Sequence, residues 1–77
     1  MKNFKINNMD WKNWIENNFY NAIDVIRFIE RENLQDYEIS WKTPVTGEYK
    51  TLIRVENGIK TYETDLFKLP SVFKKIK

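Results

Sequence analysis

Residues 49–64, YKTLIRVENGIKTYET, predict a β-hairpin. Asn57-Gly58 lies between two segments that alternate with a period of two. Both central positions of a type I′ turn need a positive φ, which Asn and Gly tolerate. A hairpin that closes on this dipeptide pairs Ile53 with Tyr62 and places the apolar side chains of both strands on one face, so the predicted register is self-consistent.

Residues 37–42, YEISWK, alternate in the same way and predict a third strand before the hairpin. Its register depends on the connection that follows. A four-residue loop turns the two apolar faces apart, whereas a five-residue loop or a bulge pairs Ile39 with Ile53 and Trp41 with Thr51. We favour the second arrangement, because a slip of one residue would move every core side chain to solvent.

Residues 10–33 predict a long helix that Asp10 can cap. Its apolar arc is about 180° wide, more than the ~100° that packing on one sheet face requires. Several asparagines are mediocre helix formers, so we expect this helix to depend on tertiary packing. The apolar positions that recur with helical spacing are Ile15, Phe19, Ala22, Ile26 and Ile29.

The two ends of the chain add short elements. Phe4 and Ile6 alternate with lysines, which allows a short N-terminal edge strand, and Pro70 can begin a short C-terminal helix. The predicted fold is therefore α+β, with a long N-terminal helix packed on a three-stranded antiparallel sheet and a short C-terminal helix. We expect residues 1–77 to form a single domain.

The composition argues against several classes of function. The chain has no Cys and no His, which excludes a disulfide scaffold, a Cys/His zinc site, a thiol nucleophile and a His-dependent triad. Gly47 and Gly58 are isolated in turns, so no Gly-rich phosphate loop is present. We expect no enzyme activity, no catalytic or metal-binding residue and no cofactor.

The sequence also contains no segment that predicts membrane attachment or export. No stretch approaches 18 consecutive apolar residues, and the first ten residues lack the continuous apolar core of a signal peptide. We therefore expect a cytoplasmic protein without membrane contact, in the host-cell cytoplasm if a phage encodes it.

The charge balance makes nucleic-acid binding an alternative function. The chain contains thirteen Lys and Arg residues and eleven Asp and Glu residues, which gives a net charge of +2. Acidic residues on the predicted outward sheet face offset the cations there, so binding would be weak and would fall steeply with salt. The candidate nucleic-acid-binding residues on the sheet and in the tail are Lys42, Lys50, Arg54, Lys74, Lys75 and Lys77.

Protein binding is the function that the aromatic residues favour. Tyr20 lies in the middle of the polar arc of the predicted helix, and Phe28 and Trp14 lie at its margins. With the wide apolar arc, they indicate a second buried surface, covered by the C-terminal helix, a second copy of the chain or a larger protein. Since Trp, Tyr and Arg dominate interface energetics, the predicted protein-binding residues are Trp14, Tyr20, Arg27, Phe28 and Arg54.

Residues 29–65, IERENLQDYEISWKTPVTGEYKTLIRVENGIKTYETD, resemble small phage-encoded anti-CRISPR proteins in their layout. The resemblance rests on LIRVENG followed by an alternating strand. It implies a very small, non-enzymatic inhibitor that occupies the surface of a larger host protein complex. The chain lacks the strong acidity of those members that mimic DNA, so the resemblance transfers neither that mechanism nor any binding residue.

Overall fold

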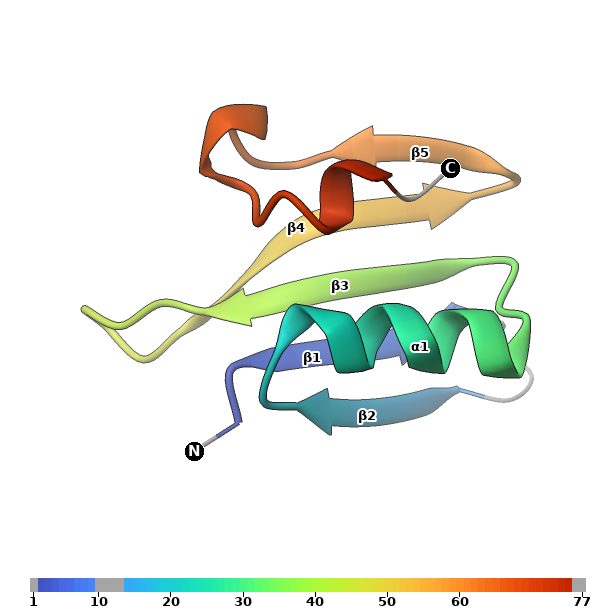
Figure 1. The fold of residues 1–77 in the computed structure, drawn as a ribbon, viewed down its shortest axis with the longest axis horizontal. Coiled ribbons are helices and arrows are strands. Elements are labelled where there is room, and N and C mark those ends of the chain that lie inside the picture. Colours follow the sequence, from blue (N-terminus) through green and yellow to red (C-terminus); the bar gives the residue numbers. More distant parts are fainter. Residues whose placement is uncertain (1, 10–13, 76–77) are drawn as a thin grey trace.

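The computed structural model of the chain describes residues 2–9 and 14–75. These residues form an antiparallel sheet with the strand order β2-β1-β3-β4-β5, one α-helix and two short 3₁₀ turns (Figure 1). The α+β class is confirmed, but the predicted arrangement within it is wrong. The elements are β1 (Phe4–Asn8), β2 (Ile15–Phe19), α1 (Ala22–Glu32), β3 (Tyr37–Lys42), β4 (Tyr49–Glu56), β5 (Ile59–Tyr62), η1 (Leu66–Lys68) and η2 (Phe73–Lys75).

The long N-terminal helix is the main correction. Residues 15–19 form β2, antiparallel to β1, and the helix begins only at Ala22. Asn21 has an extended backbone, and its side-chain oxygen accepts the Asp24 N–H at 2.9 Å. Asn21 therefore caps the helix by satisfying one of its free N–H groups. The expected cap, Asp10, lies outside the described residues.

The helix packs on the sheet through one narrow face. Ala22, Val25 and Ile29 are buried and recur at the spacing of one helical stripe. The helix ends at Asn33, whose φ of 51° is left-handed, and the Leu34 N–H donates to the Ile29 carbonyl at 3.2 Å. This hydrogen bond uses a carbonyl that the last turn of the helix leaves free.

β1 is a central strand rather than the short edge strand that the sequence predicts. It lies between β2 and β3, where Phe4 pairs with Trp41 and Ile6 pairs with Ile39. Phe4 and Ile6 are both buried. The edges of the sheet are therefore β2 and β5.

The hairpin predicted around Asn57-Gly58 is confirmed. The φ angles of Asn57 and Gly58 are 53° and 77°, as a type I′ turn requires. Ile53 pairs with Tyr62 across this turn. The pairing of Ile39 with Ile53 is also confirmed.

A register shift follows directly after that last pair. Ser40 pairs with Thr51, so Leu52 is an extra residue in β4, which is the definition of a β-bulge. The expected partner of Thr51, Trp41, pairs instead with Lys50. Side chains alternate along a strand. The residues of β4 before the bulge therefore point to the sheet face opposite to the one that the sequence predicts for them.

The C-terminal helix predicted from Pro70 is wrong: in the described residues only the 3₁₀ turn η2 follows Pro70, and η1 precedes it. Phe73 in η2 is fully buried, and its ring lies 5.6 Å from that of Phe4. Residues 66–75, which we call the C-terminal segment, therefore cover the same sheet face as α1 (Figure 1). The buried core comprises Phe4, Ile6, Ala22, Val25, Ile29, Tyr37, Ile39, Leu52, Ile53, Val55, Leu69 and Phe73.

The other face of the sheet is polar. The Lys5 ammonium lies 3.1 Å from the Glu16 carboxylate, and the Arg54 guanidinium lies 3.4 Å from the Glu38 carboxylate. These are partly exposed pairs between neighbouring strands, and such pairs contribute little to stability.

Candidate functional site

Three of the five predicted protein-binding residues come together where β2 leads into α1. Tyr20 lies in the connection, and Arg27 and Phe28 lie on the helix. With Asp24 and Arg31 they line a shallow depression of about 330 Å³. We call these five residues the Tyr20 surface.

A pair of aromatic rings supports this surface. The Phe28 ring lies 5.2 Å from the Phe19 ring at a tilt of 54°, an arrangement that aromatic pairs favour. Both rings are half-buried and pack against the core. The Arg31 guanidinium lies 5.5 Å from the centre of the Phe28 ring, within cation–π range. Phe28 is therefore fixed between the core and the surface.

Tyr20 and Arg27 are both accessible on the Tyr20 surface. The Tyr20 side chain is 59% exposed. Arg27 is exposed and forms no ion pair within residues 2–9 and 14–75, whereas Arg31 lies 3.5 Å from Glu32. The surface thus combines an exposed aromatic ring with a guanidinium that is free to bind a carboxylate.

Trp14 and Arg54 lie away from the Tyr20 surface. Trp14 precedes β2 and Tyr20 follows it, so about 20 Å of extended chain separates them. Trp14 is 55% exposed there. Arg54 lies on the polar sheet face, where Glu38 binds it and also accepts a 2.8 Å hydrogen bond from the Thr51 hydroxyl.

The sheet cations expected to bind nucleic acid lie on two faces. Lys42 and Arg54 are on the polar face, and Glu38 offsets the charge of Arg54. The bulge pairs Lys50 with Trp41. Because neighbouring side chains alternate, Trp41 points to the face opposite to that of Lys42, which is the face that α1 covers. Lys50 lies on that face with Trp41. The three cations therefore do not form one basic surface.

The cations of the tail are separate again. Lys74 and Lys75 belong to the C-terminal segment, on the sheet face that α1 covers, and the Lys74 ammonium lies 5.9 Å from the centre of the Phe67 ring. Lys77 lies outside the described residues. The described tail cations and the cations of the polar face point to opposite sides of the sheet.

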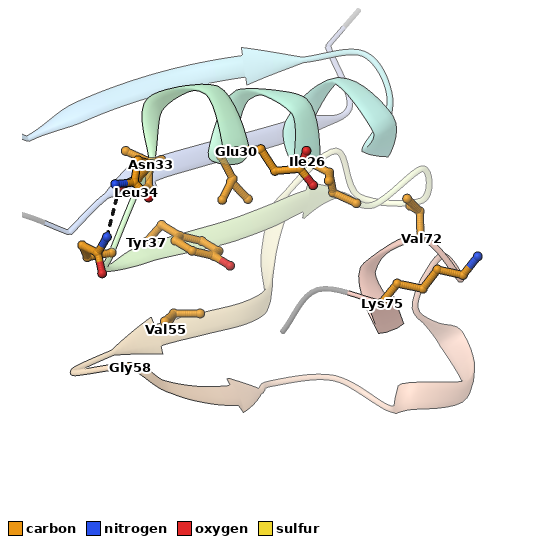
Figure 2. A pocket seen from close by; sticks show the side chains of 11 residues that line it. Ile26, Glu30, Asn33, Leu34, Tyr37, Val55, Gly58, Val72 and Lys75 are labelled. Atoms are coloured by element: carbon orange, nitrogen blue, oxygen red, sulfur yellow. Dashed lines mark hydrogen bonds between the residues drawn. The ribbon is translucent and has the colours of Figure 1, made fainter.

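A larger groove, which the sequence does not predict, lies between α1 and the C-terminal segment (Figure 2). Its volume is about 760 Å³. Burial raises the pKa of Tyr37 in this groove, with a smaller contribution from Tyr62. We call it the Tyr37 groove, and its apolar lining comprises Ile26, Ile29, Leu34, Tyr37, Val55 and Val72.

The described residues contain neither a candidate metal site nor a candidate membrane-spanning helix. Within residues 2–9 and 14–75, no three carboxylates gather into a group that could hold a metal ion. None of the helical segments in the described part of the chain has the length and apolar character that a membrane span requires.

No protein-family model matches the chain, and neither a curated protein nor a solved structure matches it.

Proposed function

We propose that this chain is a small, non-enzymatic protein-binding module that occupies the surface of a larger protein through the Tyr20 surface. The observation that carries the proposal is the exposed Tyr20 ring beside the unpaired Arg27, above the fixed Phe19–Phe28 ring pair. Interfaces concentrate their energy in a few Tyr, Trp and Arg residues. The core already holds the Phe28 ring in place, so this ring loses little conformational entropy when a partner binds.

The charges of the Tyr20 surface indicate what the partner presents. Arg27 and Arg31 lie one turn apart on α1, and Asp24 lies on the turn before them. A partner carboxylate is therefore attracted to the arginines and repelled at the start of the helix. We expect the partner to place an apolar side chain on the aromatic rings and an Asp or Glu next to Arg27.

The edge strand β2 offers a second means of contact beside Tyr20. β2 is hydrogen-bonded to β1 on one side and forms the edge of the sheet on the other. An exposed edge is a template for an added strand, either from a target protein or from a second copy of the chain. A homodimer is therefore the competing occupant of this end of the molecule.

The inhibitory role, the phage source and the cytoplasmic location belong to the same proposal. They rest on the resemblance to anti-CRISPR proteins and on the composition, and they assign no residue. The nucleic-acid alternative gains no support from the cations, because those described lie on opposite faces of the sheet.

The test compares surface variants with a matched control. Four proteins are immobilised: the wild type, Tyr20→Ala, Arg27→Ala and Ile59→Ala. The partner protein that they capture is identified and purified. Calorimetry then measures its affinity for each of the four. Ile59 is a suitable control, since it is 68% exposed on the opposite edge strand. We expect the Tyr20 and Arg27 variants to bind about tenfold or more weakly, which is about 1.4 kcal/mol each.

The control variant should bind within about twofold of the wild type, as a substitution outside the interface does. Equal affinities for all four proteins would show that the partner binds elsewhere. Sedimentation at twice the 9.4 kDa chain mass, reduced by Tyr20→Ala, would identify a second copy as the occupant instead.

A further inference from the structure

The Tyr37 groove has the dimensions and the lining of a small-molecule site. Ile26 of α1 lies on one side and Val72 of the C-terminal segment on the other, and Tyr37 and Val55 lie between them on β3 and β4 (Figure 2). Ile29 of α1 also lines the groove. The volume of about 760 Å³ lies within the range of roughly 300–1,000 Å³ that such sites occupy.

The hydroxyl of Tyr37 is a polar group without a partner at this site. The residue is only 3% exposed, yet its oxygen has no hydrogen-bond partner among residues 2–9 and 14–75. The oxygen points along the groove toward the side where Val72 and Lys75 lie (Figure 2). The Tyr37 oxygen is not among the fully buried polar atoms that lack a partner, so although the rest of the side chain is buried, a ligand atom in the groove can reach this oxygen.

The protonation state of Tyr37 decides which ligand atom fits. Burial raises the pKa of the Tyr37 hydroxyl above its usual value, so it keeps its proton at neutral pH and can donate it. The rim carries one carboxylate, Glu30, and one ammonium, Lys75. An acceptor oxygen near Tyr37 is therefore favoured, and Lys75 adds attraction if that oxygen is charged.

We propose that the Tyr37 groove binds a small molecule that has an apolar body and one acceptor oxygen. This oxygen, of a carbonyl or a carboxylate, accepts a hydrogen bond from the Tyr37 hydroxyl. The apolar body lies between α1 and the C-terminal segment. This site is separate from the Tyr20 surface and does not depend on the protein-binding proposal.

The test is an NMR titration of the full-length protein with octanoate, and in parallel with octylammonium, which has the same chain length but no acceptor. We expect octanoate to shift the amide signals of Ile29, Tyr37, Val55 and Val72. Tyr37→Phe removes one oxygen and keeps the ring, so it should weaken octanoate binding about tenfold and weaken octylammonium binding less, since an ammonium can only donate to the neutral hydroxyl oxygen. Val72→Trp narrows the groove and should weaken both.

The Tyr37→Phe comparison remains informative even if the Val72→Trp variant fails to fold. Equal octanoate affinities for the wild type and Tyr37→Phe overturn the proposal. Octanoate shifts that map to the Tyr20 surface overturn it as well. A third outcome would also overturn the proposal: the wild type does not bind octanoate, and Val72→Trp no longer binds the protein partner. This result would show that the groove belongs to a protein interface.

Discussion

The ring of Phe19, the last residue of β2, lies against the ring of Phe28 in α1, with the ring centres 5.2 Å apart. In a continuous helix these two positions would be separated by about 13.5 Å along the axis. The contact therefore requires the chain to turn back between them, which it does at Tyr20 and Asn21. Tyr20 is left on the outside of this turn, and this explains its exposure.

The first prediction separates the support of the Tyr20 surface from its accessible part. Phe28→Ala removes a half-buried ring that packs on Phe19 and the core, so we expect a loss of about 2–3 kcal/mol. Tyr20→Ala should change stability by less than about 0.5 kcal/mol. Urea unfolding followed by circular dichroism measures both. Equal losses would place Tyr20 in the core and remove it from the proposed interface.

The second prediction concerns the start of α1. Asn21→Ala removes the side-chain oxygen that accepts the Asp24 N–H at 2.9 Å, so stability should fall by about 1 kcal/mol. Asn21→Asp keeps an acceptor at the same position and serves as the matched control. Thermal unfolding of the two variants checks this, and an unchanged melting temperature for Asn21→Ala contradicts the assigned cap.

The third prediction isolates a backbone effect at Gly58. Its φ is 77°, and a Cβ added there would have no atom within 4 Å, so Gly58→Ala strains the backbone without any clash. We expect a loss of about 1 kcal/mol. Gly58→Asn should lose less, because Asn tolerates the left-handed region. A loss that is equal for Ala and Asn would contradict the assignment of the loss to the left-handed backbone of Gly58.

The hairpin could be predicted from the sequence because its signals are local. Asn57-Gly58 fixes the turn, and the alternation on either side fixes the register. The long helix was wrong because Ile15 and Phe19 fit a helical spacing as well as they fit an alternating strand. Pairing with β1 decides between these two structures, and this contact is not visible in the local pattern.

The bulge at Leu52 is a second feature that local reasoning misses. The alternation of β4 continues through this position without a Gly or Pro, so the sequence carries no mark of an extra residue. Leu52 is buried in the same core cluster as Leu69 and Phe73, which follow much later in the chain. The alternation of β4 predicts an outward Leu52, whereas the bulge places this residue in the core.

The candidate sites differ in the same way. The sequence groups Tyr20, Arg27 and Phe28 on one long helix, and the turn after β2 still keeps them together. The Tyr37 groove could not be predicted, because α1, β3, β4 and the C-terminal segment all contribute to it. Only the three-dimensional arrangement brings these segments to one sheet face.

The fourth prediction is a pH dependence that belongs to Tyr37. Its pKa is raised in the folded protein, first by burial and then by Tyr62, so the unfolded chain loses this proton first as the pH rises. The contribution of Tyr37 is complete below about pH 10 and is lost above it. The wild type should therefore lose stability above pH 10 more steeply than Tyr37→Phe.

A second group titrates in the same range and has the opposite sign. Burial lowers the pKa of Lys60 in the folded protein, so this residue favours the folded state more as the pH rises toward 10.5. Lys60 is present in both proteins, and the difference between them removes its contribution. Parallel stability curves for the wild type and Tyr37→Phe above pH 10 would contradict the assigned burial of the hydroxyl.

The central claim, that a larger protein docks on the Tyr20 surface, is tested most directly by site-specific photo-crosslinking. A benzophenone amino acid replaces Tyr20 in one protein and Ile59, on the opposite edge of the sheet, in a control. The account predicts a single crosslinked partner from position 20 that disappears with Arg27→Glu, and none from position 59. Crosslinking from position 59 alone, or crosslinking from position 20 that persists with Arg27→Glu, would contradict it.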